Sequence, residues 1–352
     1  MKYFNLFNKL IMNVPINISK YHIYDIYHND NNNIIIISPA ESYQLNIKYE
    51  NETFSINVCP DNHTYIYVLK SQTEYKKHIT INISGENIYT EVNKYPEFKN
   101  EIIMTTEVKD EDAYIRQWII FHYNIGVSRF IIYDNSENNV LSTLLSDFIK
   151  NKIVLLINWK YPLFLENSGR SGQPTQQNHS IWAFKNSKYI GLFDIDEYVN
   201  IKNETNIHRF FNNLIYYEKI NTKNIGSFRL LNKFFYNPHN LPTNDFEFLK
   251  IYNCGEILLY EREKNFVIPK NVYTFSVHTI TLGKEIYTVP HNKLYFNHYC
   301  FLNKQTRCKD NTNLIDNSMS SKIFSKNILP IINKLKINKL KINNNKFTIQ
   351  LL

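Results

Sequence analysis

The 352-residue chain has little of what marks disulfide-rich, zinc-binding or membrane-spanning proteins. It contains 4 cysteines and no Cys-x-x-Cys pair, so we expect neither a disulfide framework nor a cysteine zinc site. No stretch is long and apolar enough to cross a membrane, and residues 1–18 are interrupted by asparagines and Pro15, which makes them too polar for a signal peptide. We therefore expect a cytoplasmic protein or one attached peripherally to a membrane.

Glycine is also scarce, with 8 residues, whereas Asn, Ile, Lys, Tyr and Phe are abundant. This composition is typical of an AT-rich coding sequence, and it weakens any motif that depends on Asn or Lys. Hydrophobic residues make up 43% of the chain and charged residues 20%, the proportions of a folded protein with a large core and more than one domain. The net charge of +8 favours an anionic ligand, namely nucleic acid, a nucleotide-sugar or an acidic membrane surface, without choosing among them.

The most informative stretch is residues 188–199, Lys-Tyr-Ile-Gly-Leu-Phe-Asp-Ile-Asp-Glu-Tyr-Val, where an apolar segment runs into three acids. Residues 189–193 predict a buried parallel strand, and Asp194, Asp196 and Glu197 follow at its carboxyl end, where open α/β sheets bind ligands. Acids this close repel one another unless a cation lies among them. Asp194 and Asp196 can both reach one divalent metal, which indicates an Asp-x-Asp site for a metal and a diphosphate. A solvated turn is the other interpretation of this tripeptide.

The acidic stretch ends a region in which predicted strands and helices alternate. We expect strands at residues 101–107, 129–133, 153–159 and 189–193, with helices at 110–126, 140–150 and 174–182 between them. This alternation predicts an α/β domain with a parallel sheet and right-handed crossovers. Farther on we expect a helix at 207–220 and strands at 227–236, 273–280, 286–289 and 294–301, the last group carrying His278 and His298.

The two ends of the chain have different patterns. Short apolar or alternating runs before residue 99 are separated by turn-rich pieces, which predicts a small antiparallel sandwich without catalytic groups. We therefore expect a β-rich domain at residues 1–98 and the α/β domain at residues 99–317. Residues 318–352 form a basic amphipathic tail, in which Ile328, Ile331, Ile332 and Leu335 fall at helical spacing beside lysines. Such a tail would lie on an anionic membrane, pack on the domain or remain disordered.

Three segments together resemble a known family. Residues 108–135 read Val-Lys-Asp-Glu-Asp-Ala-Tyr-Ile-Arg-Gln-Trp-Ile-Ile-Phe-His-Tyr-Asn-Ile-Gly-Val-Ser-Arg-Phe-Ile-Ile-Tyr-Asp-Asn, residues 194–198 read Asp-Ile-Asp-Glu-Tyr, and residues 297–299 read Asn-His-Tyr. In this order they resemble the motifs of glycosyltransferase family 92 and its relatives in the nucleotide-diphospho-sugar transferase (GT-A) superfamily. The resemblance covers about residues 101–302. Asp110 stands where the family has Asn, Gln117 where it has Glu, and the family's Lys-Ser after His-Tyr is absent.

The resemblance implies a mostly parallel GT-A sheet and a metal-dependent transferase. Such an enzyme moves a hexose, for example galactose, from a UDP-sugar to a glycan, glycoprotein or glycolipid acceptor, with inversion. Mn²⁺ or Mg²⁺ held by Asp194, Asp196 and His298 would neutralise the departing diphosphate, and His278 is the second choice for the histidine. No nucleic-acid partner is expected.

Other polar residues are candidates for the donor and the acceptor. Asp134 would accept hydrogen bonds from uracil or ribose, or else form a turn with Asn135. The full set expected at the donor is Glu107, Lys109, Asp110, Asp134, Gln177, Asn178 and Asp194. The general base that takes the acceptor proton is assigned to Asp245 or Glu247, with Glu256 and Glu197 as further carboxylates in that region. Core packing is the preferred interpretation of Trp118, His122 and Trp182.

Two other classes of protein share parts of this pattern. Haloacid-dehalogenase-like phosphohydrolases also place Asp-x-Asp after a strand, but their motif has a small Thr or Val where this chain has Tyr198. A non-enzymatic module that binds glycans or nucleic acid would also use the 26 tyrosines and 23 phenylalanines as stacking surfaces. Nucleotide binding separates these classes, because a glycosyltransferase should be stabilised by UDP with Mn²⁺.

Overall fold

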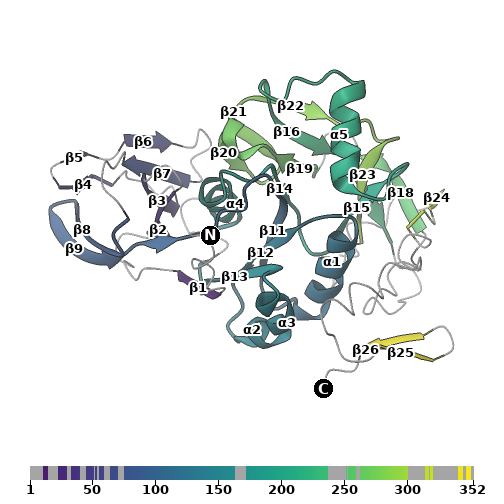
Figure 1. The fold of residues 1–352 in the computed structure, drawn as a ribbon, viewed down its shortest axis with the longest axis horizontal. Helices are drawn as coiled ribbons and strands as arrows, with labels where there is room; N and C mark the ends of the chain where they lie inside the picture. The colour runs from purple at the N-terminus through teal and green to yellow at the C-terminus, as the bar shows by residue number, and fades with distance from the viewer. Residues whose placement is uncertain are drawn as a thin grey trace, which may run out of the picture.

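The structure is a computed structural model. It describes residues 11–14, 23–29, 33–39, 45–50, 52–53, 55–58, 64–69, 75–162, 172–236, 251, 253–258, 262–299, 314–316, 318–319, 340–343 and 346–349. Strands predominate in these ranges, and helices cover both faces of the largest sheet (Figure 1).

The largest sheet has eight strands and is mixed. Its order is β1 (Ile11–Val14), β13 (Val154–Trp159), β12 (Arg129–Asp134), β11 (Ile102–Val108), β14 (Tyr189–Leu192), β19 (Lys264–Val267), β16 (Ile225–Leu230) and β22 (Glu285–Thr288). The first five strands are parallel to their neighbours, as the alternation of strands and helices predicts. β19 pairs antiparallel with both β14 and β16. The α/β class is therefore confirmed, whereas the expected mostly parallel sheet describes one part of a mixed one.

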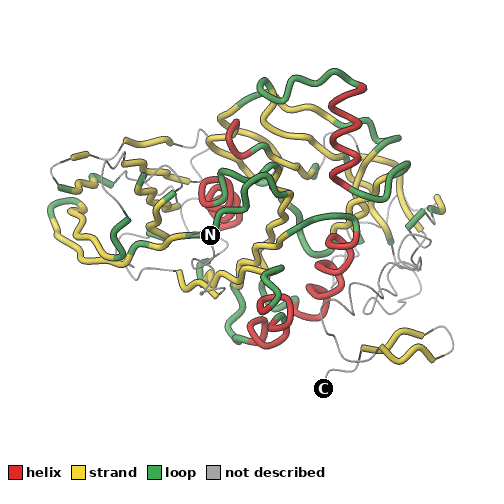
Figure 2. The backbone as a smooth tube through the Cα atoms, in the orientation of Figure 1, coloured by secondary structure: helices red, strands yellow, loops and turns green. Residues whose placement is uncertain are grey.

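The helices lie on both faces of this sheet because its central strands are apolar on both sides. On β11, Ile102 and Met104 join one buried core, and Ile103 between them joins the other. The first core contains α1 (Asp112–Asn124), α2 (Val140–Leu144), α3 (Ser146–Lys150) and α5 (Ile207–Tyr217), and the second contains α4 (Gly172–Ala183). Figure 2 shows α4 set apart from the other helices.

Three predicted elements are divided in the structure. The helix expected at 140–150 is interrupted at Leu145 and forms α2 and α3. The strand expected at 227–236 is β16 followed by β17 (Asn232–Phe235), which belong to different sheets. The strand expected at 273–280 is a hairpin of β20 (Val272–Ser276) and β21 (Thr279–Gly283), preceded by the 3₁₀ helix η4 (Pro269–Asn271). The pattern of apolar residues does not reveal where the chain bends or passes to another sheet. Each of these pairs of elements was therefore predicted as a single helix or strand.

The N-terminal part forms two further sheets that pack together. One contains β10 (Asn93–Lys94), β2 (Asp25–His28), β3 (Ile34–Pro39), β7 (Thr64–Leu69) and β6 (Ser55–Val58). The other contains β5 (Glu52–Thr53), β4 (Ile47–Tyr49), β8 (His78–Ile83) and β9 (Glu86–Glu91). Ile34 and Ile36 of β3 face the core between these sheets, whereas Ile35 and Ile37 join the core around α4. β1 precedes these strands in the chain but belongs to the large sheet. The domain boundary at residue 98 therefore stays a prediction.

A buried polar cluster joins this N-terminal region to α4. The carboxylate of Asp25, fully buried, lies 2.8 Å from Nε2 of His179 and accepts hydrogen bonds from Tyr95 and Asn93. The other ring nitrogen of His179 contacts the hydroxyl of Tyr133 at 2.7 Å. Because each polar group has a partner, the cluster can be buried without a large desolvation penalty.

A second mixed sheet completes the region after β14. Its order is β15 (Glu197–Ile201), β23 (Leu294–His298), β17, β18 (Asn253–Leu258) and β24 (Leu314–Ile315). The C-terminal hairpin consists of β25 (Leu340–Asn343) and β26 (Lys346–Ile349). The amphipathic segment with Ile328, Ile331, Ile332 and Leu335 lies outside the described residues. Within the described ranges, no helix has the length and hydropathy needed to cross a membrane.

Candidate active site

The three acids of the Asp-x-Asp stretch are held in a tight turn between two sheets. β14 ends at Leu192 and β15 begins at Glu197, so the turn carries the chain from the large sheet to the second one. The backbone N–H of Glu197 donates to the carbonyl of Asp194 at 3.1 Å, and the carboxylate of Glu197 accepts from the backbone N–H of Asp194 at 2.9 Å. These bonds fix the acids at the carboxyl end of β14, as the sequence predicted.

His298 reaches two of these acids from β23. β15 and β23 pair antiparallel with Glu197 directly opposite His298, which places both side chains on one face. Nε2 of His298 lies 3.3 Å from Oδ2 of Asp196, and Nδ1 lies 3.7 Å from Oε1 of Glu197. All three residues are buried, and they offer ligand atoms that lie within 4.8 Å of one another. We call Asp196, Glu197 and His298 the acid–histidine triad.

The triad fits a divalent metal. Nδ1 of His298 is buried and has no hydrogen-bond partner, which is costly unless a ligand occupies the position facing it. Two carboxylates and one imidazole are a donor set that suits Mn²⁺ and leaves room for water or substrate oxygens. Asp196 and His298 were predicted as metal ligands, and the structure brings them together with Glu197.

Asp194, the third predicted metal ligand, lies outside the triad. Its Oδ2 is 2.8 Å from Nζ of Lys264, and its Oδ1 accepts a hydrogen bond of 3.1 Å from Gln173. The Asp194 side chain is 45% exposed, whereas that of Lys264 is 1% exposed. The aspartate therefore pairs with an internal lysine at the mouth of the site.

Burial and neighbouring charges shift the pKa values of the ionisable groups in the site. Burial raises the pKa of Glu197 to about 7, an effect that Lys264 opposes and the neighbouring aspartates reinforce. Burial alone would lower the pKa of His298, but the carboxylates of Asp196 and Glu197 raise it above its usual value. The pKa of Lys264 is also raised, because Asp194 and Glu197 outweigh its desolvation, so this lysine stays charged. The site thus contains one fixed cation and an excess of acids.

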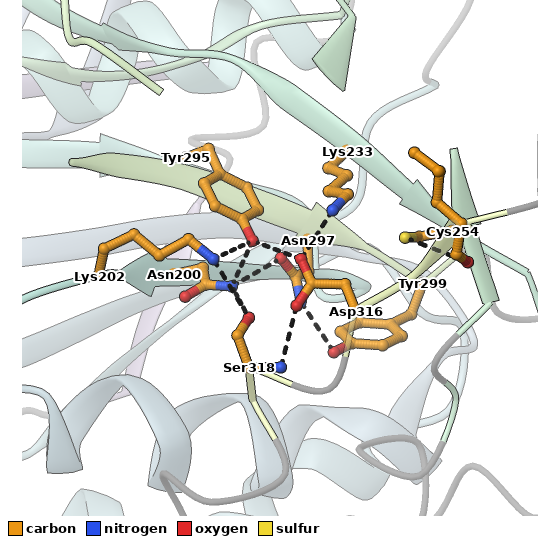
Figure 3. Close-up of polar contacts among 10 residues, drawn as sticks. Asn200, Lys202, Lys233, Cys254, Tyr295, Asn297, Tyr299, Asp316 and Ser318 are labelled. Carbon is orange, nitrogen blue, oxygen red and sulfur yellow. Dashed lines mark hydrogen bonds and ion pairs between the residues drawn. The ribbon is translucent and has the colours of Figure 1, made fainter. Parts of the chain in front are cut away.

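The face of the second sheet opposite the triad explains the rest of the Asn-His-Tyr motif. Asn297 and Tyr299 point away from the triad, and Asn297 donates to the hydroxyl of Tyr299 at 3.0 Å and accepts from Asn200 of β15 at 3.2 Å. Farther along this face, Asp316 accepts hydrogen bonds from Lys233 and Tyr295 (Figure 3). This layer fixes β15 against β23, and so it positions Glu197 and His298.

The predicted donor residues at the ends of β11 and β12 lie at one edge of the large sheet. Val108 pairs with Asp134 across these parallel strands. Asp134 is 1% exposed and its Oδ1 accepts from the backbone N–H of Ser136, which is the turn that the sequence left open, while its Oδ2 is buried without a hydrogen-bond partner. Glu107 accepts a hydrogen bond from Asn135. Lys109 and Asp110 are exposed at the same edge.

Of the two predicted donor residues on α4, the structure keeps one near the site. Asn178 is fully buried, donates to the carbonyl of Phe275 and accepts from its N–H, both at 2.8 Å. This amide holds α4 on β20, and its contact with the donor stays a prediction. Gln177 donates to the carbonyl of Val277, next to His278, and lies on the same helical face as Gln173.

The other predicted residues divide as follows. Asp245 and Glu247, the candidate bases, lie outside the described residues, and Glu256 is exposed on β18. His278 contacts the carbonyl of Glu263 through Nδ1, and burial lowers its pKa to about 4, so it is a neutral histidine outside the triad. Trp118, His122 and Trp182 lie in the core as predicted. Trp118 also donates to the carbonyl of Glu197.

Sequence reasoning missed Lys264 and Gln173. Lysine is so common in this chain that Lys264 carries no signal, and only the pairing of β19 with β14 brings it to the acids. Gln173 lies just before the helix predicted at 174–182, in what was expected to be a loop, whereas α4 of the structure begins at Gly172 and includes it.

Comparison with known proteins gives a family for the sequence. The sequence model of glycosyltransferase family 92 matches residues 103–346, more than half of the chain. A family 92 protein of Arabidopsis thaliana is 28% identical over 123 residues, which cover 33% of this chain and 19% of the relative. One from Ricinus communis is 20% identical over 173 residues, which cover 49% of this chain and 29% of the relative. The chain thus matches less than a third of the length of these relatives.

Solved structures show only distant similarity. HddC from Yersinia pseudotuberculosis has a TM-score of 0.32 and 11% identity, with 56% of this chain and 92% of that one covered. S. aureus TarS 1-349 has a TM-score of 0.30 and 14% identity, with 58% and 61% covered. Scores this low do not establish a shared fold.

The sequence match places the chain in a family of glycosyltransferases. The chain belongs to glycosyltransferase family 92. This family is different from that of the haloacid-dehalogenase-like phosphohydrolases considered above.

Proposed function

We propose that the chain transfers a hexose from a UDP-sugar to a glycan, glycoprotein or glycolipid acceptor, with inversion and with Mn²⁺ or Mg²⁺ as cofactor. The observation that carries this proposal is the buried acid–histidine triad at the carboxyl end of β14 in a family 92 chain. A family of sugar transferases needs a group that stabilises the departing diphosphate, and the triad is a donor set for such a cation.

Each group of residues has a role in this proposal. Asp196, Glu197 and His298 would hold the metal, which supplies Lewis-acid stabilisation of the diphosphate when bound. Asp194, at the mouth of the site, would orient the donor through hydrogen bonds to its hydroxyl groups. Lys264 keeps Asp194 in place, since their charged groups lie 2.8 Å apart.

The nucleotide would bind along the edge formed by β11 and β12, as in a GT-A enzyme. Asp134 and Glu107 would accept hydrogen bonds from uracil or ribose, and the exposed Lys109 lies at the same edge for the phosphates. This edge and the triad are both at the carboxyl ends of parallel strands, since β11 pairs with β12 on one side and with β14 on the other.

The acceptor hydroxyl must lose a proton to a carboxylate as it attacks the anomeric carbon. We assign this role to Asp245 or Glu247, which follow β17 in the chain. In an inverting reaction the acceptor oxygen bonds to the anomeric carbon as the bond to the diphosphate breaks, and the acceptor proton passes to this base.

A screen of nucleotide-sugars tests the proposal. UDP release from UDP-galactose and other UDP-hexoses is measured with the full chain in Mn²⁺ and in a chelator. We expect release that depends on both the UDP group and the metal. Hydrolysis of small phosphate esters as fast as UDP release from UDP-sugars, or no stabilisation by UDP with Mn²⁺, would contradict it.

A further inference from the structure

Lys264 is an internal cation beside the triad. It begins β19, and the pairing of this strand with β14 directs it toward the turn that carries the acids. Its side chain is 1% exposed, and its Nζ lies 2.8 Å from Oδ2 of Asp194 and 3.1 Å from Oε2 of Glu197. A buried lysine remains charged only with such partners, so both contacts are needed to keep it there.

The two carboxylate oxygens of Glu197 have different partners. Oε2 accepts from Nζ of Lys264 and from the backbone N–H of Asp194. Oε1 lies on the other side, 3.7 Å from Nδ1 of His298. One oxygen is therefore committed to the protein, and the other faces the rest of the triad. A cation in the triad would meet Glu197 through Oε1 alone.

We propose that Lys264 is a specificity-determining residue for the cation, because it holds Glu197 as a ligand with one available oxygen. The inference rests on the proposed metal dependence. Ca²⁺ takes six to eight oxygens and commonly uses both oxygens of a carboxylate, whereas Mg²⁺ requires near-ideal six-coordinate geometry at shorter distances. Mn²⁺ accepts carboxylates and imidazole together. A site with one-oxygen carboxylates and a histidine therefore disfavours Ca²⁺.

The experiment compares cation binding by the parent and by Lys264→Met, without any donor, by competition with a fluorescent metal indicator. The methionine keeps an unbranched side chain and removes the charge. It removes the cation from Oε2 of Glu197, which then keeps only the hydrogen bond from the backbone N–H of Asp194, and it leaves the acids more negative, so both ions should bind more tightly. Ca²⁺ should gain more, and the preference for Mn²⁺ over Ca²⁺ should fall by about tenfold or more.

The matched control is Arg116→Met. Arg116 is also a largely covered cation paired with a carboxylate, at 2.8 Å from Oδ1 of Asp147, but this pair joins α1 to α3 and lies outside the second sheet. This variant should keep the parent's preference. A preference that is unchanged in Lys264→Met, or that falls equally in the control, overturns the role of Lys264.

A second measurement needs no variant. In a crystal structure of the full chain with Mn²⁺ bound, Glu197 should ligate through Oε1 alone, with Nζ of Lys264 still at Oε2. Bidentate Glu197, or a displaced Lys264, overturns the inference while leaving the proposed function intact. If the parent binds no divalent cation, the proposed metal dependence fails, and this inference fails with it.

Discussion

Glu197 and His298 face each other across the antiparallel pairing of β15 and β23, with Oε1 of the acid 3.7 Å from Nδ1 of the histidine. The register of these strands therefore creates the candidate metal centre. A slip of one residue would turn His298 to the opposite face, where Asn297 now lies. The polar layer on that face, from Asn200 to Asp316, resists such a slip (Figure 3).

The two aspartates should differ in their effect on metal affinity. Asp196→Asn removes a charge from the triad, so we expect the affinity for Mn²⁺ to fall by about a hundredfold or more. Asp194→Asn removes a charge that Lys264 already neutralises, and the affinity should fall by about threefold at most. Isothermal titration of the donor-free proteins measures both. Equal losses in the two variants would place Asp194 among the ligands.

The Asp25 cluster should contribute to the stability of the fold and leave metal binding unchanged. Asp25→Ala leaves His179, Tyr95 and Asn93 buried without their acceptor, and we expect the free energy of unfolding to fall by about 3 kcal/mol or more. Urea denaturation measures this change. The control is Lys76→Ala, which breaks an exposed ion pair with Glu50 in the same N-terminal region and should be nearly neutral. Similar small effects in both variants would contradict the docking role of the cluster.

His122 should make the fold less stable in acid. Burial lowers its pKa from 6.5 to about 3, and its neutral form donates from Nδ1 to the carbonyl of Trp118 and accepts at Nε2 from the N–H of Val199. The unfolded chain takes up a proton below pH 6.5 and the folded chain does not until about pH 3, so stability falls as the pH decreases between these values. The loss by pH 5 is about 2 kcal/mol.

The measurement for His122 compares urea denaturation at neutral pH and at about pH 5 for the parent and for His122→Gln. Glutamine offers one amide donor and one acceptor but does not titrate. The parent should lose about 2 kcal/mol more than the variant over this interval. An equal loss in both proteins would show that His122 is not the group responsible.

Gly126 should be needed where α1 ends. It has a φ of +104°, and a Cβ there would lie 2.5 Å from Nδ2 of Asn206, the residue whose side chain caps the N-terminus of α5. Gly126→Ala should therefore lower the free energy of unfolding by about 2 kcal/mol or more, through strain and the disturbed cap. Gly85→Ala is the control, because Gly85 has a φ of +94° and open space around its Cα. Gly85→Ala should lower the free energy of unfolding only through the strain of a positive φ. A decrease as large as that of Gly126→Ala would contradict a steric clash with Asn206.

The sequence was most informative where one stretch of chain contains the whole signal. The strand at 189–192, the acids after it and the glycine that ends α1 all follow from local pattern. His298 required the family resemblance, because a single histidine on a late strand has no local signal. The position of Lys264 could not be predicted, because it depends on the antiparallel pairing of β19 with β14. For the same reason the sequence did not indicate that Asp194 pairs with Lys264 while Asp196 lies with His298.

The same reasoning explains the errors in the fold. The chain passes from one sheet to another between β16 and β17, and nothing in this aromatic run of sequence indicates it. The two strands were therefore predicted as one. Asn178 was expected at the donor because a polar residue on a helix is normally at an exposed or functional face. In the structure α4 is covered by the N-terminal sheet on one side and by β20 on another, so Asn178 donates to the side chain of Thr64 and to the backbone carbonyl of Phe275.

UDP release from the preferred UDP-sugar, measured for the parent and for Asp196→Asn with Mn²⁺ and after chelation, tests the central claim most directly. Asp147→Asn, which alters a carboxylate paired with Arg116 between α1 and α3, outside the sheet of the triad, is the matched control. We expect UDP release by the parent to require the metal and the control variant to release UDP at the parent's rate. Asp196→Asn should fold, but its rate of UDP release should fall by about a hundredfold or more, equivalent to a barrier higher by about 2.7 kcal/mol or more. A folded Asp196→Asn protein within a few-fold of the parent, or release that chelation leaves unchanged, would contradict a metal-dependent glycosyltransferase built on Asp196, Glu197 and His298.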